Sequence, residues 1–115
     1  MATTDPDGHW LLHRGRVLAT LEIAATRRDR RRGLLGREAI EGAMLLRPAR
    51  SVHTFGMRFA IDVAHLDAEG TVLHLTTMRP GRLGRFMRRA RAVVETDAGA
   101  FDRWGVVVGD RLEIR

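Results

Sequence analysis

Apolar and polar residues alternate over several short stretches of this chain, and Gly, Pro or Asp residues separate these stretches. A period of two residues is typical of β-strands that bury one face. Many short strands with turn signals predict a mostly β domain of the antiparallel β-sandwich or barrel type, with one or two short α-helices. The predicted strands cover residues 9–13, 17–23, 43–47, 61–67, 71–78, 92–96 and 111–115, with a further extended segment at 51–54.

Two segments predict helices. Thr26 and Asp29 have the spacing of a helix start, in which a hydroxyl caps the first turn and an acid occupies the third helical position. This helix is expected to run to about residue 35 and to end at Gly36, because glycine readily adopts the left-handed conformation that ends helices. A second short helix is predicted over 98–104, before Gly105.

The clearest local prediction is a hairpin over residues 61–78. Its three-residue connection ends on Gly70, where a left-handed residue is needed. A regular ladder from this turn places Asp62 near Thr76 and puts His74 on the same face. The opposite face, which carries His65, is more apolar and is expected to face the core.

Length and composition indicate one self-sufficient domain. The chain has 115 residues, of which 44% are hydrophobic and 30% charged. We expect a disordered lead-in over 1–8 and a single domain over 9–115. Because the start of the chain has no apolar run, no signal peptide and no membrane partner are expected, and a cytoplasmic location is predicted. The absence of Cys excludes disulfides and thiolate chemistry.

The chain is basic, with a formal net charge of +6, and all twenty basic residues are Arg. This pattern has two explanations: bidentate contacts to anions, or the codon usage of a GC-rich genome. Arg clusters at 27–32 and 79–91 could attract nucleic acid, but aromatic residues make up only 5% and Tyr is absent. A stacking platform is therefore not predicted, and any nucleic-acid binding should be weak and non-specific.

The segment over residues 51–63 holds the densest group of chemically capable side chains. It lies between two predicted strands, where loops on a rigid scaffold commonly carry binding sites. With one Arg from the following basic loop, it forms a candidate polar site for a ligand. The candidate residues are His53, Thr54, Met57, Arg58, Asp62 and Arg79.

Several motifs, taken in order, resemble a known family. They are Arg-Gly-Leu-Leu-Gly-Arg at 32–37, the segment 42–48, His-Thr-Phe-Gly-Met-Arg-Phe-Ala-Ile-Asp at 53–62, the segment 89–95 ending in Glu, and Gly-Asp-Arg-Leu at 109–112. This pattern resembles the domain of unknown function 192, a bacterial and archaeal family. The resemblance implies a compact, mostly β, sandwich-like domain and implies no settled activity.

Three functional hypotheses follow. The leading one is a non-catalytic binding or accessory domain, most simply a monomer, for a small anionic ligand or an acidic protein surface. The second is a hydrolase-like enzyme in which His53 is the general base and Asp62 orients it. The third is weak nucleic-acid binding through the Arg clusters. A zinc-like set of His53, Asp62 and His74 is possible by composition, but no tight ligand motif exists, so no metal and no cofactor are predicted.

Overall fold

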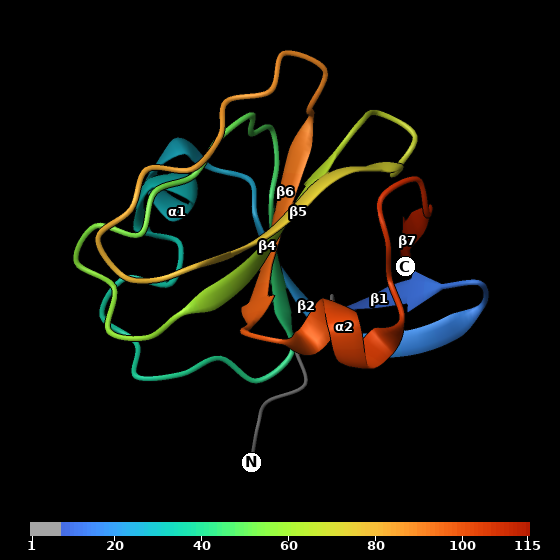
Figure 1. Cartoon of the computed structure of the whole chain (residues 1–115), viewed down its shortest axis with the longest axis horizontal. Helices are drawn as coiled ribbons and strands as arrows, with labels where there is room; N and C mark the ends of the chain where they lie inside the picture. The colour runs from blue at the N-terminus through green and yellow to red at the C-terminus, as the bar shows by residue number, and fades with distance from the viewer. Residues whose placement is uncertain (1–7) are drawn as a thin grey trace.

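Within residues 8–115, seven strands form one sheet that curls into a half-barrel, and two short helices lie against it (Figure 1). This computed structural model describes residues 8–115, so the lead-in predicted over 1–8 falls almost wholly outside the described residues. The mostly β prediction is confirmed. The elements are β1 (His9–His13), β2 (Arg16–Ala24), α1 (Arg27–Arg32), β3 (Ala43–Leu46), β4 (Ile61–Leu66), β5 (Val72–Met78), β6 (Ala92–Asp97), α2 (Ala100–Trp104) and β7 (Leu112–Ile114).

The strands lie in the order β5-β4-β6-β3-β2-β1-β7. Neighbours are antiparallel except for β2 and β3, which are parallel. The parallel pair arises because α1 and the loop that follows it carry the chain back before β3 begins, as a crossover must. At one end the two sheet edges meet: Thr71 bridges Arg111, and the Leu112 N–H donates to the Gly70 carbonyl at 2.9 Å.

Strand β1, from the start of the domain, pairs with β7 from its end. The pairing extends to backbone bonds in both directions between Trp10 and Arg115, at 2.6 and 3.0 Å. β7 therefore forms the second edge of the sheet and holds β1 between two partners.

Each face of the sheet has its own apolar core. One core contains Leu11, Leu45 and Val94, and α2 contributes Phe101 to it. The other core, on the opposite face, includes Val63 and is covered by α1 and by long loops. None of the helices in the described part of the chain is long and apolar enough to cross a membrane.

The predicted helix start is confirmed, but the predicted helix end is wrong. Thr26 caps α1 by accepting a hydrogen bond from the Asp29 N–H at 3.0 Å. The helix ends at Gly33, three residues before Gly36, because Gly33 takes a positive φ of 48° and its N–H bonds back to the Asp29 carbonyl. Helix α2 ends at Gly105 as predicted.

The hairpin forms with Gly70 at φ 87°, as predicted, but the regular register is wrong. Leu73 has no partner across the pair, so a bulge shifts the ladder by one residue. Asp62 consequently pairs with Thr77, and His65 pairs with His74. The acid and His74 therefore lie on opposite faces, and the polar face expected from the turn does not form.

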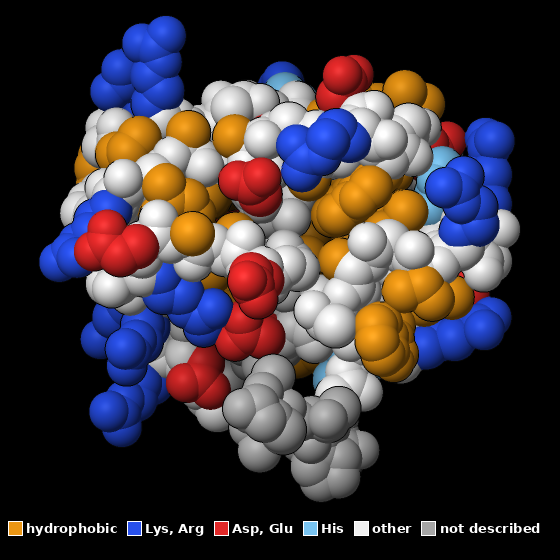
Figure 2. Space-filling model, turned by 90° about the horizontal axis from the view of Figure 1, so that it is seen from below, with side chains coloured by type: hydrophobic (Ala, Val, Ile, Leu, Met, Phe, Trp, Pro, Cys, Tyr) orange, Lys and Arg blue, Asp and Glu red, His pale blue; other side chains and the backbone are white. Residues whose placement is uncertain are grey.

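The extended segment predicted at 51–54 forms only an isolated bridge, in which His53 pairs with Leu83 of the basic loop over 79–91. Backbone bonds flank the bridge, from the Thr54 N–H to the Arg82 carbonyl and from the Gly84 N–H to the Val52 carbonyl, both at 2.8 Å. Figure 2 shows Arg side chains projecting at both sides of one view, with apolar side chains exposed between them.

Candidate functional site

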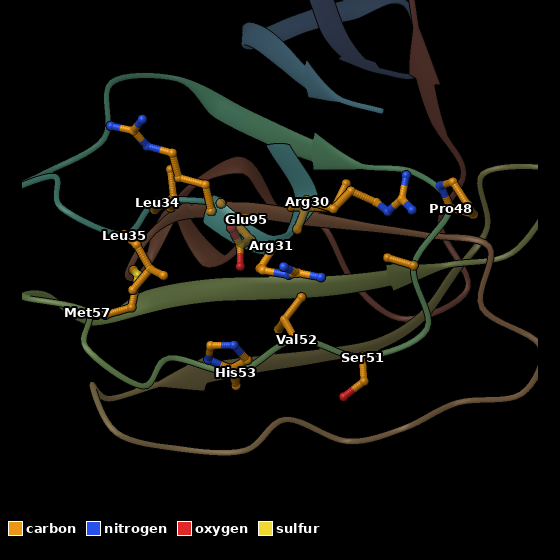
Figure 3. A pocket seen from close by; sticks show the side chains of 14 residues that line it. Arg30, Arg31, Leu34, Leu35, Pro48, Ser51, Val52, His53, Met57 and Glu95 are labelled. Atoms are coloured by element: carbon orange, nitrogen blue, oxygen red, sulfur yellow. The ribbon is translucent and has the colours of Figure 1, made fainter. Parts of the chain in front are cut away.

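A pocket of about 260 Å³ lies on the face of the sheet that α1 covers (Figure 3). Its walls come from the end of α1, the end of β3 and the loop that follows β3, and one strand of the sheet contributes a single acid. The lining residues are Arg30, Arg31, Arg32, Gly33, Leu34, Leu35, Leu46, Pro48, Ala49, Ser51, Val52, His53, Met57 and Glu95.

Glu95 is an acid in the middle of an apolar surface. It lies on β6, a central strand, directly between Met44 on β3 and Val63 on β4, both of which are buried. The residue is only 3% exposed, and its Oε1 atom has no hydrogen-bond partner within the described residues. Figure 3 shows the carboxyl group pointing toward the space that Arg31, His53 and Met57 surround.

Burial sets the proton affinity of this group. Removal from water disfavours the charged carboxylate and raises the pKa of Glu95 to about 7. Near neutral pH the group is thus divided between a protonated form, which can donate a hydrogen bond, and a charged form, which only accepts. Such a group can bind a donor, or it can exchange a proton with a bound molecule.

The end of α1 leaves little room above the buried carboxyl group. Gly33 lies directly over it: a Cβ at this position would stand 3.4 Å from Glu95 Oε1. The three Arg residues before Gly33 line the pocket, and none of them forms an ion pair within residues 8–115. The early helix end therefore places a glycine over the buried acid and positive charge along the same pocket.

Two of the six candidate residues line this pocket. His53 is exposed, its ring is stacked on Phe55 with centroids 5.0 Å apart, and its Nδ1 accepts a hydrogen bond from the Phe55 N–H at 3.2 Å. Met57 is buried and belongs to the core cluster below the pocket.

Thr54 and Arg58 have partners of their own. The fully buried Thr54 hydroxyl donates to the Arg79 carbonyl at 2.6 Å and accepts from the Arg82 N–H at 2.9 Å. It thereby holds the start of the basic loop against the segment over 51–54. Arg58 forms an exposed ion pair with Glu38.

Asp62 lies on the other face of the sheet, away from His53. One carboxylate oxygen accepts the Thr77 hydroxyl at 2.6 Å and the other accepts the Phe101 N–H at 3.3 Å, so Asp62 links β5 to α2. The pair of His53 and Asp62 expected for a general base does not form. The side chain of Arg79 lines a separate groove beside β5.

The bulge in β5 also separates the candidate metal ligands. Because His74 pairs with His65, both lie on the face of the sheet opposite to Asp62. His74 instead packs edge-on against His65, with ring centroids 5.7 Å apart. Across residues 8–115, no three His, Asp or Glu side chains gather in a way that could hold a metal ion.

Comparison with known proteins identifies the family. Residues 10–114 match the family model of DUF192, which is described as "Uncharacterized ACR". The chain belongs to the DUF192 family. Its sequence is 43% identical to a UPF0127 protein of Pyrococcus furiosus and 40% identical to one of Pyrococcus abyssi, each over 63 residues. These matches cover 55% of this chain and 54% of each relative, so the matched part spans about half the length of the curated relatives.

Two solved structures share the fold of this DUF192 domain. One, from Sinorhizobium meliloti, is named a "putative transcription regulator" and superposes with a TM-score of 0.78 at 24% identity, covering 92% of this chain and 91% of that one. The other, a protein of unknown function from Novosphingobium aromaticivorans, gives a TM-score of 0.69 at 17% identity, covering 92% and 83%. At these identities the likeness shows the fold alone.

Sequence reasoning missed Glu95 as a site residue of the DUF192 domain. It ends one of the family-like motifs, and it stands in a strand whose preceding residues, 92–94, are all apolar. An acid directly after three apolar residues of a predicted strand was the available signal, because buried acids are rare without a partner.

Proposed function

We propose that this DUF192 domain is a small, non-catalytic binding domain and that its ligand occupies the Glu95 pocket. The observation that carries the proposal is the buried carboxyl oxygen of a pocket-lining residue, which has no hydrogen-bond partner among the described residues. An unpaired buried polar group is costly, and a ligand that donates a hydrogen bond would offset that cost.

The pocket lining favours a ligand with two different ends. Glu95 would accept a donor such as an amine or amide, while Leu34 and Val52 offer apolar contact to the middle of the molecule. The guanidinium groups of Arg31 and Arg32 would attract a carboxylate or phosphate at the other end. This chemistry supports the small anionic ligand expected from the sequence, with a hydrogen-bond donor added to its description.

Ligand-observed NMR with a defined panel tests this proposal. The panel contains simple amines, simple carboxylates, and compounds that carry both groups, such as amino acids, dipeptides and amino phosphates. We expect binding by members with both groups, weakened about tenfold or more by Glu95→Gln and by Arg31→Ala. Glu41→Gln is the matched control, since Glu41 is exposed and lies outside the pocket. Equal binding by Glu95→Gln and the control, or no binding by any member, would contradict the proposal.

An enzyme is the second candidate, with Glu95 in place of Asp62 as the acid beside His53. Glu95 lines the same pocket as His53, whereas Asp62 does not. A general-base role for His53 would therefore involve Glu95. Turnover of a panel member during the NMR experiment, abolished by Glu95→Gln, would favour this alternative.

Weak nucleic-acid binding is the third candidate. Phe86, which is 64% exposed, lines a surface hollow together with four Arg residues. None of the four forms an ion pair within the described residues. They are Arg50, Arg88, Arg89 and Arg91. The name of the Sinorhizobium relative points in the same direction. Phosphate contacts of this kind bind polyanions in a salt-dependent way and without sequence preference.

A further inference from the structure

Strand β5 forms one edge of the sheet, and most of its outer side has no backbone partner within residues 8–115. Only its first residue is covered: the Val72 N–H donates to the Asp110 carbonyl at 2.8 Å, and its carbonyl accepts from the Gly109 N–H at 2.9 Å. From His74 to Met78 the strand pairs with β4 alone. Alternate N–H and C=O groups of these residues therefore point away from the sheet.

This stretch of edge lacks the usual protection against pairing. Natural proteins protect exposed edges with charged side chains, proline, a bulge or a covering loop. The bulge of β5 lies at Leu73, before the open stretch, and residues 74–78 read His-Leu-Thr-Thr-Met, without charge or proline. The open stretch can therefore accept another strand.

A basic groove of about 390 Å³ runs beside the open edge. His74, Thr76 and Met78 form its strand side, and Arg79, Arg82 and Arg85 form its loop side. No acid lines the groove, and none of its three Arg residues forms an ion pair within residues 8–115.

The groove is also lined by Leu83, which lies between Arg82 and Arg85 in the sequence and has an apolar side chain that is 74% exposed. The whole segment over 70–94 contains no Asp or Glu. The groove thus offers positive charge and apolar surface next to unpaired backbone.

We propose that an extended acidic segment of a partner protein adds to β5 as an eighth strand. Main-chain bonds to residues 74–78 would supply affinity, and acidic side chains at alternate positions would reach Arg82 and Arg85. A second copy of this chain fits less well, because it would bring its own three groove Arg residues to the same face of the joined sheet, on a protein of net charge +6. The proposal does not depend on the ligand of the Glu95 pocket, which lies between α1 and the loop after β3.

The test follows backbone amide signals of the ¹⁵N-labelled protein by NMR while a capped peptide of alternating Val and Glu is added. We expect shifts along residues 74–78 and at least tenfold weaker binding of the matching Val and Lys peptide. A Val and Glu peptide with every backbone amide N-methylated should not bind, because it has no N–H group left to donate to the strand edge.

Two charge-matched double variants locate the contact. Arg82→Glu with Arg85→Glu should abolish binding of the acidic peptide. Arg27→Glu with Arg28→Glu, exposed on α1, changes the net charge equally and should keep most of the binding. The amide spectrum of each variant reports directly whether it is folded.

Four results would overturn the proposal. The first is the absence of shifts along β5 with the acidic peptide at about 1 mM. The second is binding of the N-methylated peptide as tight as that of the unmethylated one. The third is a loss of peptide binding in the α1 double variant as large as in the groove double variant. The fourth is a set of β5 shifts produced by raising the protein concentration alone, which would assign the edge to self-association. If oligothymidylate instead shifts residues 74–78 and competes with the peptide, the groove belongs to nucleic acid.

Discussion

Replacing Glu95 by Gln should stabilise the folded protein at neutral and alkaline pH. The folded state raises the pKa of Glu95 from 4.5 to about 7, and burial is the cause. Between these two values the folded protein holds a proton that the unfolded chain has released, so its stability falls as the pH rises through this window. Below pH 4.5 both states are protonated and the penalty is absent; above pH 7 it is complete.

The size of the effect follows from the shift. The rise of the Glu95 pKa from 4.5 to about 7 lowers the free energy of unfolding by about 3 kcal/mol when the group is ionised, at 1.36 kcal/mol for each pKa unit. Gln has nearly the same shape and does not ionise, so Glu95→Gln should have about wild-type stability at pH 4 and should gain this amount at pH 8. For a domain of this size the gain corresponds to a rise in melting temperature of roughly 10 °C.

Urea denaturation at several pH values from 4 to 8 measures the difference between variant and wild type. Taking the difference cancels the titration of other groups, and Glu41→Gln shows the behaviour of an exposed Glu, with a difference that stays near zero. A Glu95→Gln difference that does not change with pH, or a variant less stable than wild type at pH 8, would refute the reasoning. It would mean that the carboxylate has a favourable partner in the folded protein.

Three further predictions concern the fold and its charges. Gly70→Ala should lower stability by about 2 kcal/mol or more in thermal denaturation, because the new Cβ would overlap the Leu112 carbonyl oxygen; Gly15→Ala, with a similar φ but open space, should cost less. Zinc titration by calorimetry should show no sub-micromolar site, since the candidate ligands lie apart, and a tight site would contradict this. Arg88→Ala with Arg89→Ala should weaken all polyanions alike in filter binding, with steep salt dependence; selective binding that persists at physiological salt would show specific recognition.

Local signals predicted the elements of this fold well. The cap at Thr26 and the positive φ at Gly70 follow from the chemistry of single residues and their neighbours, so they can be read from the sequence. The parallel pairing of β2 and β3 could not be read in this way, because it depends on where a long crossover returns. The bulge at Leu73 also escaped prediction, and this one residue reversed the face on which His74 lies.

The structure brings part of the predicted segment to the pocket. The sequence located the segment with His53 and Met57, which line the pocket, because polar residues between strands are visible in one dimension. It could not show that Thr54 and Asp62 are occupied by internal hydrogen bonds. Nor could it show that the end of α1 places Gly33 over the carboxyl group of Glu95, since that depends on packing between segments more than sixty residues apart.

The pairing of β1 with β7 has a consequence for the synthesis of the protein on the ribosome. Among the strands of the described residues β1 is translated first and β7 last, so β1 is made well before one of its two partners. One side of β1 therefore stays unpaired in the nascent chain. The pairing of β1 with β7 can form only after residue 114 has left the exit tunnel. Ribosome-bound intermediates of this domain should accordingly remain sensitive to proteases until β7 has paired with β1, and they should depend on chaperones more than those of a domain built from local contacts.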